Sequence, residues 1–408
     1  MSVSRRDGAR RGSRGRGLLR WFVVLAALAL LFALVVLAPA ALVAPAPPAW
    51  VPTPLEKWGY DVRLALATSG KDLSSLRAGS LSDRRVWRGG EGETIRLESD
   101  GLTLVGSLHL PPGFRPPASG AAKPAVLLLH GSTPRGRRLG IYRVLAPALA
   151  ECGFVVLNLD QRGYGDSEDP PRLDDPAAFD YVADVGSAVR YLTALPGVDP
   201  DRVYVVGHSF GGDVALAAGT RIEGIAGIAA IGPARRFAET VGRPDAPQLD
   251  YFRRREMRYM RLPAEPEADV FLRYRGALTI DMLHAYYGQP GHAPVLLIDG
   301  ALEGADNLAF LAREHEAMAP PKAYVTLPDA DHYLNVSDFG PIVLYDARVL
   351  AWAVDLLAGW LAQQSVQAAG TRVRLSRSAY TIPPSSASTS KSRYASHAKA
   401  TAAPTEIP

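Results

Sequence analysis

The most reactive pattern in the chain is G-H-S-F-G at residues 207–211, which places Ser209 in the motif G-x-S-x-G. A short β-branched run precedes it, and an alanine-rich stretch typical of a helix follows. Between a strand and a helix, this motif is typical of a nucleophile elbow, a tight turn that exposes the serine hydroxyl. We therefore predict that Ser209 is a catalytic nucleophile. The alternative is that the small residues only let a helix pack closely on a sheet.

A serine hydroxyl is a weak nucleophile near neutral pH, so it needs an adjacent base, and the base needs an orienting acid. With this type of elbow the acid and the histidine follow the serine in the chain, in loops after later strands. His332 is the histidine that follows Ser209 and comes just past the last predicted strand. We predict His332 as the general base.

The acid is chosen among carboxylates in the loops after the last two predicted strands. Glu303 lies a few residues past the strand at 295–300, where its long side chain can reach an imidazole. We predict Glu303 as the acid, and Asp306 in the same loop stays an alternative. Asp299 at the strand end is expected to point into the sheet, while Asp329 and Asp331 beside the histidine are more distant alternatives. Each of them also fits a solvated loop carboxylate.

Backbone N–H groups beside the serine are expected to hold the oxyanion. We predict the N–H of Phe210, which follows the nucleophile, and that of Ser132 in the loop after the strand at 125–131. Asp160 and Arg162, in the turn D-Q-R-G-Y-G-D-S, are expected to brace these loops. No group of His, Cys and carboxylates has metal-ligand spacing, so we expect neither a metal nor an organic cofactor.

Short apolar strands alternate with helical segments from residue 125 onward. This alternation predicts an α/β fold whose sheet is mostly parallel, with helices on both faces. Before it, residues 93–112 alternate apolar and polar side chains around Asp100-Gly101, which predicts a hairpin. The predicted strands are 125–131, 154–160, 202–206, 225–233, 295–300 and 323–329, and the predicted helices are 139–152, 177–195, 213–219, 307–319 and 342–363.

The alternation breaks at 234–290, an insertion dense in aromatic residues and arginines. Since it lies between two sheet strands, we predict a lid over the carboxyl ends of the strands. An irregular helical excursion on the surface is the alternative. Its acids, Glu239, Glu256, Glu265 and Glu267, could bind a substrate amine.

The two ends of the chain are expected to lie outside the catalytic domain at 93–365. Residues 1–17 are a basic segment, and 18–43 include an apolar run that is uncharged from residue 21 onward and long enough for one transmembrane helix. We predict an uncleaved signal anchor with the arginines in the cytoplasm and the catalytic domain outside it. A cleaved signal peptide is the alternative. Residues 44–92 are interpreted as a linker and 366–408 as a disordered tail.

Composition narrows the function classes. The formal net charge of +4 is small, and much of the excess lies in the two ends, so we expect no nucleic-acid binding. One cysteine, Cys152, excludes an intrachain disulfide and is expected to be a small buried residue. The predicted partners are a small acyl substrate and the membrane.

Several motifs together resemble the α/β-hydrolase superfamily: L-L-L-H-G-S, D-Q-R-G-Y-G-D-S-E, V-Y-V-V-G-H-S-F-G-G, V-L-L-I-D-G-A-L-E and P-D-A-D-H-Y-L-N. The resemblance covers about residues 93–363 without the insertion, and it is nearest the dienelactone hydrolase and prolyl oligopeptidase branch. Dienelactone hydrolases carry cysteine where this chain has Ser209, and no segment before residue 93 matches an oligopeptidase propeller. In the family the acid after the seventh strand is usually Asp, a position that falls on Glu303 here.

The resemblance implies an α/β-hydrolase fold and a serine hydrolase of small acyl substrates. We predict a membrane-anchored extracytoplasmic carboxylic esterase that works through a Ser-His-acid triad and an acyl-enzyme. An exopeptidase or amidase with the same residues is the second hypothesis. A catalytically inactive binding module is the third.

Overall fold

The computed structural model describes residues 76–78, 81–114, 121–133, 135–172, 175–233, 275, 277–339 and 342–368. The basic segment 1–17, the apolar segment 18–43 and nearly all of the tail 366–408 lie outside the described residues. Within the described part, no helix has both the length and the apolar character needed to cross a membrane.

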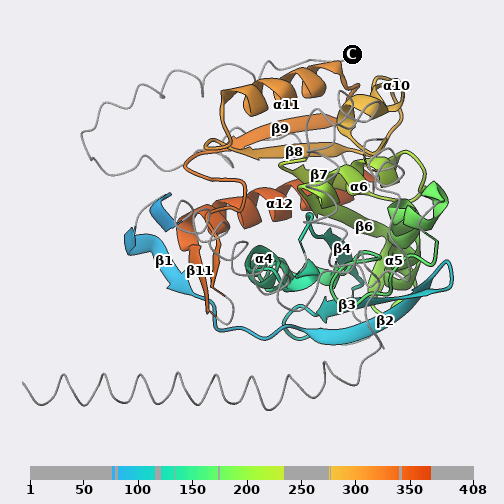
Figure 1. Cartoon of the computed structure of the whole chain (residues 1–408), viewed down its shortest axis with the longest axis horizontal. Helices are drawn as coiled ribbons and strands as arrows, with labels where there is room; N and C mark the ends of the chain where they lie inside the picture. Colours follow the sequence, from blue (N-terminus) through green and yellow to red (C-terminus); the bar gives the residue numbers. More distant parts are fainter. Residues whose placement is uncertain are drawn as a thin grey trace, which may run out of the picture.

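An eight-stranded sheet forms the centre of the molecule, in the order β2-β3-β5-β4-β6-β7-β8-β9 (Figure 1). The pairs from β5 to β9 are parallel, whereas β2 and β3 pair antiparallel with each other and β3 pairs antiparallel with β5. The mostly parallel α/β sheet predicted from the sequence is confirmed. The strands are β2 (Glu93–Ser99), β3 (Leu102–His109), β4 (Lys123–Leu129), β5 (Val155–Leu159), β6 (Val198–His208), β7 (Gly227–Ile231), β8 (Val295–Gly300) and β9 (Lys322–Leu327).

Helices cover both faces of this sheet, as two separate apolar cores show. One core contains residues of α5 (Tyr181–Ala194), α6 (Phe210–Gly219) and α11 (Ala305–Ala317). The other contains residues of α4 (Gly140–Glu151) and α12 (Ala347–Ala368). Alternate residues of one strand enter opposite cores: Leu127 belongs to the first and Val126 to the second. A strand buried on both faces reads as a continuous apolar run, which is why these strands were recognisable.

The predicted hairpin turns at the Asp-Gly pair. Asp100 and Gly101 have φ angles of 49° and 77°, the left-handed values that a two-residue type I′ turn requires. The turn sets the register of β2 against β3, from Ser99 opposite Leu102 to Glu93 opposite Leu108.

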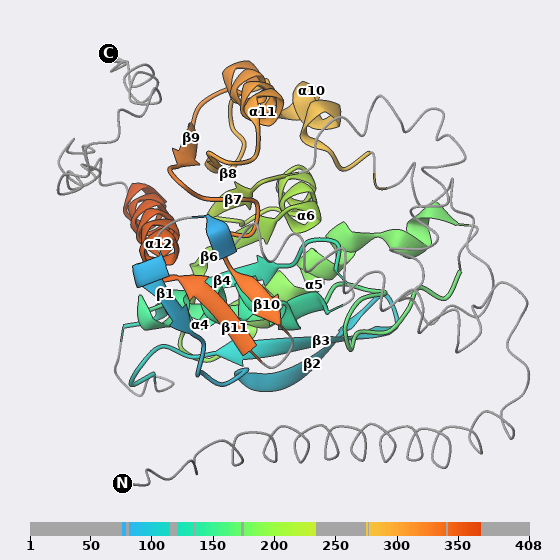
Figure 2. The same cartoon turned by 60° about the vertical axis from the view of Figure 1, so that its left-hand side comes forward.

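A second, three-stranded sheet corrects one prediction and adds two strands that were not expected, β1 (Arg84–Val86) and β10 (Ser337–Phe339). The segment 342–363 was predicted as a helix throughout, but its first residues form β11 (Ile342–Asp346). That strand pairs with β10 and with β1, which comes from the stretch interpreted as a linker (Figure 2). Asp346 then caps α12 by accepting the Val349 N–H at 3.2 Å. The apolar run I-V-L-Y suits either state, and pairing across the fold decides for a strand.

Part of the predicted lid lies among the described residues, namely 275 and 277–290. It contains a short 3-10 turn, η6 (Ile280–Leu283), and one helical turn, α10 (His284–Tyr287). The Tyr286 and Tyr287 hydroxyls donate to the carbonyls of Gly219 and Leu216, so α10 packs along α6. The acids proposed for amine binding are outside the described residues, and the lid itself stays a prediction.

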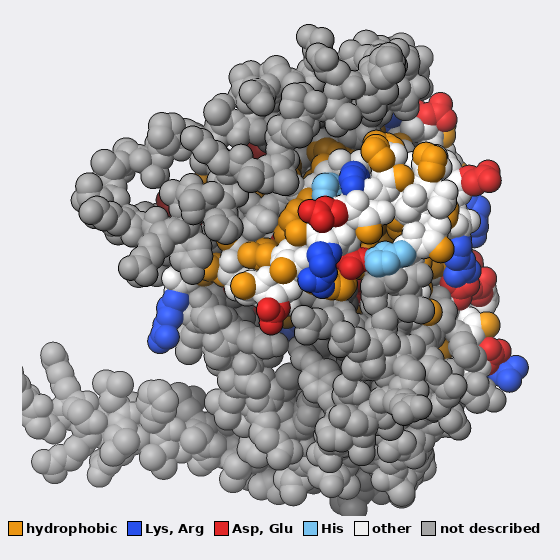
Figure 3. Space-filling model, turned by 90° about the horizontal axis from the view of Figure 1, so that it is seen from above, with side chains coloured by type: hydrophobic (Ala, Val, Ile, Leu, Met, Phe, Trp, Pro, Cys, Tyr) orange, Lys and Arg blue, Asp and Glu red, His pale blue; other side chains and the backbone are white. Residues whose placement is uncertain are grey.

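On the described surface over α11 and β9, acidic, basic and apolar side chains are interspersed (Figure 3). Cys152, predicted to be buried, is exposed at the end of α4. Cys152 is the C-cap of α4, three residues before β5 begins.

Candidate active site

The turn between β6 and α6 holds Ser209 in a strained conformation. Its φ and ψ are 53° and −124°, outside the regions that non-glycine residues ordinarily occupy. A Cβ at Gly207 would collide with the carbonyl of Gly211, so the elbow can close this tightly only with glycine at 207. The serine side chain is thereby set at the carboxyl edge of the sheet, at the start of α6.

Glu303 and His332 contact each other at the same edge. His332 lies in the loop after β9, and its Nδ1 is 3.0 Å from Oε2 of Glu303, which follows β8. The Glu303 side chain is 5% exposed and that of His332 is 33% exposed, so the pair is screened from water on the carboxylate side. A hydrogen bond to this carboxylate fixes Nδ1 as the protonated nitrogen and leaves Nε2 able to accept a proton.

Gly232 makes room for this pair. It follows β7 with φ of 52°, and a Cβ there would stand 2.9 Å from Glu303 Oε1 and 3.0 Å from His332 Nδ1. Any side chain at this position would have to displace the carboxylate or the imidazole.

The other carboxylates considered from the sequence have different surroundings. Asp306 is exposed in the first turn of α11. Asp299 is buried at the end of β8, and Asp329 forms an ion pair of 3.2 Å with Arg348. Asp331 accepts backbone N–H groups of its own loop. Glu303 is the one of these candidates that the structure places against the imidazole.

The elbow and the histidine loop adjoin. The Ser209 N–H donates to the carbonyl of Ile231, the last residue of β7, at 2.8 Å. The next residue, Gly232, lies against His332. In addition, the ring of His208, which precedes the serine, has its centroid 4.8 Å from that of His332. Ser209 and His332 therefore lie on the same side of the fold, as proton transfer between them requires.

The loop after β4 also reaches the serine. A Cβ at Gly131 would stand 2.9 Å from Ser209 Cβ, so Ser132 follows a residue in close contact with the elbow. Phe210 begins α6, and its buried ring meets Tyr181 edge-on at 5.0 Å. The two residues predicted to donate oxyanion hydrogen bonds thus both lie close to Ser209, Phe210 directly after it and Ser132 directly after Gly131.

Arg275 lies at this part of the site and was not predicted from the sequence. Its guanidinium donates to Oγ of Ser132 and stacks 4.4 Å above the centre of the Phe210 ring. The side chain is buried, at 5% exposure. A cation therefore contacts both residues predicted for the oxyanion site.

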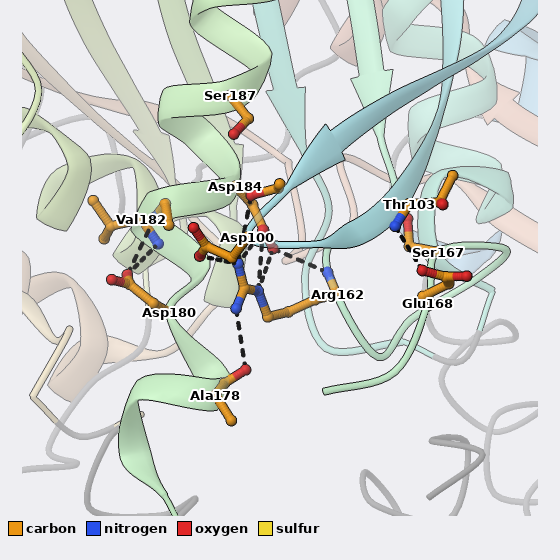
Figure 4. Close-up of polar contacts among 12 residues, drawn as sticks. Asp100, Thr103, Arg162, Ser167, Glu168, Ala178, Asp180, Val182, Asp184 and Ser187 are labelled. Carbon is orange, nitrogen blue, oxygen red and sulfur yellow. Dashed lines mark hydrogen bonds and ion pairs between the residues drawn. The ribbon is translucent and has the colours of Figure 1, made fainter. Parts of the chain in front are cut away.

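Two buried ion pairs support the loops around the site. Asp160 accepts the Arg137 N–H at 2.6 Å and pairs with the Arg137 guanidinium. Arg162 binds Asp184 of α5 and reaches Asp100 at the hairpin turn, which ties that turn to the helix (Figure 4). The bracing role predicted for Asp160 and Arg162 agrees with these contacts.

Comparisons with known proteins place the chain in a family. Residues 120–282 match the family model described as serine aminopeptidase, S33. An uncharacterized protein of Mycobacterium tuberculosis is 30% identical over 242 residues, which span 59% of this chain and 72% of that protein. The chain belongs to the α/β-hydrolase family. It is a serine hydrolase.

Other similarities are to a protein named as an esterase and to a solved structure. The esterase EstD of Thermotoga maritima is 31% identical over 145 residues, which span 34% of this chain and 32% of EstD. The solved structure of Est1E from Butyrivibrio proteoclasticus with ferulic acid has a TM-score of 0.48 and 18% identity, and covers 67% of this chain and 99% of Est1E.

The described part of the hydrolase contains no cluster of three or more His, Cys, Asp or Glu side chains placed to hold a metal ion. The residues predicted for the site are of the types used in nucleophilic acyl transfer: a hydroxyl, an imidazole, a carboxylate and backbone donors.

Proposed function

We propose that this hydrolase cleaves carboxylic esters through Ser209, His332 and Glu303. His332 Nε2 takes the Ser209 proton as the oxygen attacks the ester carbonyl, and the N–H groups of Phe210 and Ser132 hold the oxyanion. The imidazolium then protonates the leaving alcohol. Water, deprotonated by the same imidazole, releases the acid from the acyl-enzyme. The contact of Glu303 with His332 beside the strained elbow is the observation that carries this proposal.

Arg275 favours esters over peptides that carry a free N-terminal amine. An aminopeptidase must bind a protonated amine close to the scissile bond, and a guanidinium against Ser132 and Phe210 would repel that charge. The family description, serine aminopeptidase, is the observation that keeps amide hydrolysis as a second candidate. The similarity to proteins named esterases supports the first.

Labelling with a fluorophosphonate tests the nucleophile. We expect the full chain to be labelled and Ser209→Ala not to be; equal labelling of both proteins would exclude Ser209. Turnover of p-nitrophenyl esters against aminoacyl p-nitroanilides then tests the substrate class. A higher kcat/KM for the anilides would reverse the order of the two candidates.

We also propose that residues 18–43 anchor the enzyme in the membrane with the catalytic domain outside the cytoplasm. The uncharged apolar run and the arginines before it support this arrangement. The protein should stay with membranes after a carbonate wash and keep its N-terminal arginines. A mature N-terminus within 40–47 would instead identify a cleaved signal peptide.

A further inference from the structure

Three hydrogen bonds connect the oxyanion loop, the elbow and the histidine loop. The Gly131 N–H donates to the Tyr142 hydroxyl at 2.6 Å. The Tyr142 oxygen is 2.8 Å from Nδ1 of His208. Nε2 of His208 is 2.7 Å from the backbone carbonyl oxygen of His332. Tyr142 and His208 are both buried. Each makes two of these hydrogen bonds: the Tyr142 hydroxyl with Gly131 and His208, and the His208 ring with Tyr142 and His332.

The partners determine where the protons lie. A carbonyl oxygen can only accept, so Nε2 of His208 carries the proton that it donates to His332. In a neutral imidazole the other nitrogen is then an acceptor, and the Tyr142 hydroxyl donates its proton to Nδ1. The same hydroxyl oxygen accepts from Gly131. In this arrangement each group in the series from Gly131 to His332 has its hydrogen-bond partner. Protonating His208 would leave the buried Tyr142 hydroxyl proton without its acceptor.

We propose that Tyr142 and His208 form a neutral relay that positions the base, holding the His332 backbone at a fixed place relative to the oxyanion loop. This inference rests on the proposed function, since it assigns the residues that hold its base. Glu303 orients the His332 ring through Nδ1, and His208 holds the same residue through its carbonyl. His208 and Tyr142 are positioning residues that do not touch the substrate. Small displacements of a base relative to its nucleophile and oxyanion donors reduce the rate steeply.

The surroundings keep the relay neutral. Burial and, to a smaller extent, the nearby His332 lower the pKa of His208 to about 3. The titratable groups around it are His332, Glu303, His130 and Tyr142, with the Tyr333 ring at 5.8 Å. A neutral His208 adds no positive charge beside His332 when that imidazole becomes protonated during the reaction.

Substitutions at His208 distinguish the loss of its hydrogen bond to His332 from a change in side-chain volume. His208→Gln places an amide N–H near the former Nε2 and keeps a donor for the His332 carbonyl. His208→Asn places its amide near the former Nδ1 and keeps only the contact with Tyr142. His208→Leu keeps neither. The matched control is His109→Leu, which removes another buried histidine at the opposite edge of the sheet, where His109 pairs with Val156.

In the full chain, His208→Leu and His208→Asn are expected to lower kcat for a p-nitrophenyl ester by about 10- to 100-fold, with KM changed less than about twofold. The loss in His208→Gln should be at least about tenfold smaller than in His208→Leu, and His109→Leu should match the wild type. If His208→Leu does not fold, His208→Asn replaces it. Wild-type kcat in His208→Leu or His208→Asn, or a loss in His208→Gln equal to theirs, would overturn the proposal.

NMR on the full chain with ¹⁵N-labelled histidine tests the relay without turnover. The resonances missing in His208→Gln identify His208, and they should show a neutral ring protonated at Nε2 at neutral pH. A ring protonated at Nδ1, or a charged ring, refutes the relay. If the wild type hydrolyses no ester, the proposed function fails, and this measurement still decides on the relay.

Discussion

Replacing Glu303 by Gln tests the proposed acid of the triad with little change in shape. The substitution removes the negative charge that lies 3.0 Å from His332 Nδ1. Two unit charges at this separation interact by about 5 kcal/mol at an effective dielectric constant of about 20. The His332 side chain is 33% exposed, so water screens part of this energy. We take about 3 to 4 kcal/mol as the lost stabilisation of the imidazolium, which corresponds to about 10²- to 10³-fold in kcat.

The amide adds a second effect in the same direction. Gln can turn its NH₂ group toward Nδ1 and favour the tautomer in which Nε2 carries the proton and cannot act as a base. For a fully buried triad acid the combined loss is about 10⁴-fold, which sets the upper limit here. Glu303→Asp keeps the charge on a side chain shorter by one methylene, so its kcat should fall between those of the wild type and Glu303→Gln.

The assay is the initial rate of p-nitrophenyl acetate hydrolysis at saturating substrate, with thermal unfolding as the check on folding. Asp306→Asn is the matched control, because Asp306 is an exposed acid from the same stretch of chain. We expect its kcat to stay within about twofold of the wild type, as for most surface substitutions. A loss below about fivefold in Glu303→Gln, or an equal loss in Asp306→Asn, would refute the assignment of Glu303.

Three more predictions concern residues around the triad. Gly232→Ala should lower kcat by about 10²-fold, because its Cβ would displace Glu303 or His332; a wild-type kcat in folded protein would contradict this. Arg275→Met should lower kcat/KM for a neutral ester by about tenfold, less than the loss of an oxyanion donor itself, and an unchanged kcat/KM would deny Arg275 any role in the site. Burial holds the pKa of His208 at about 3 in the folded protein, whereas in the unfolded chain it is near 6.5. The free energy of unfolding should therefore fall as the pH drops from about 6.5 toward 3, by up to about 5 kcal/mol. His208→Gln should lack this loss, and urea midpoints at pH 7 and pH 4 that fall in parallel for both proteins would refute it.

Much of the main sheet was predictable because its signals are local. Continuous apolar runs mark strands buried on both faces, and Asp100-Gly101 alone specifies the hairpin turn. The small sheet was missed for the opposite reason. Its strand β1 has three residues and gains its partner, β11, from the other end of the chain, with Arg84 opposite Asp346. No short-range pattern encodes such a pairing.

The residues of the site also differ in how far the sequence predicts them. The motif and the order of residues point to Ser209 and His332, since each follows directly from a recognisable strand. The sequence favoured Glu303 as the acid but left Asp306 open, because the choice depends on how the loop after β8 turns. That loop closes with the Glu303 N–H donating to the Gly300 carbonyl at 3.0 Å, while Asp306 enters α11. Arg275 is one of many arginines in the insertion, and only its contacts distinguish it.

The fixed charges around the proposed triad match the charges that ester attack creates. In the proposed mechanism, the transition state carries a positive imidazolium at His332 and a negative oxyanion near the Phe210 and Ser132 N–H groups. The carboxylate of Glu303 lies on the imidazolium side, and the guanidinium of Arg275 lies on the oxyanion side. His208, packed against His332, stays neutral and so opposes neither charge. These groups are held in place before substrate arrives, so their favourable interaction grows as charge separates, which is the property that lowers a barrier. The Arg275 guanidinium on the oxyanion side also repels a substrate that brings an ammonium group there. The same charges thus account both for the proposed catalytic roles and for the proposed preference for esters.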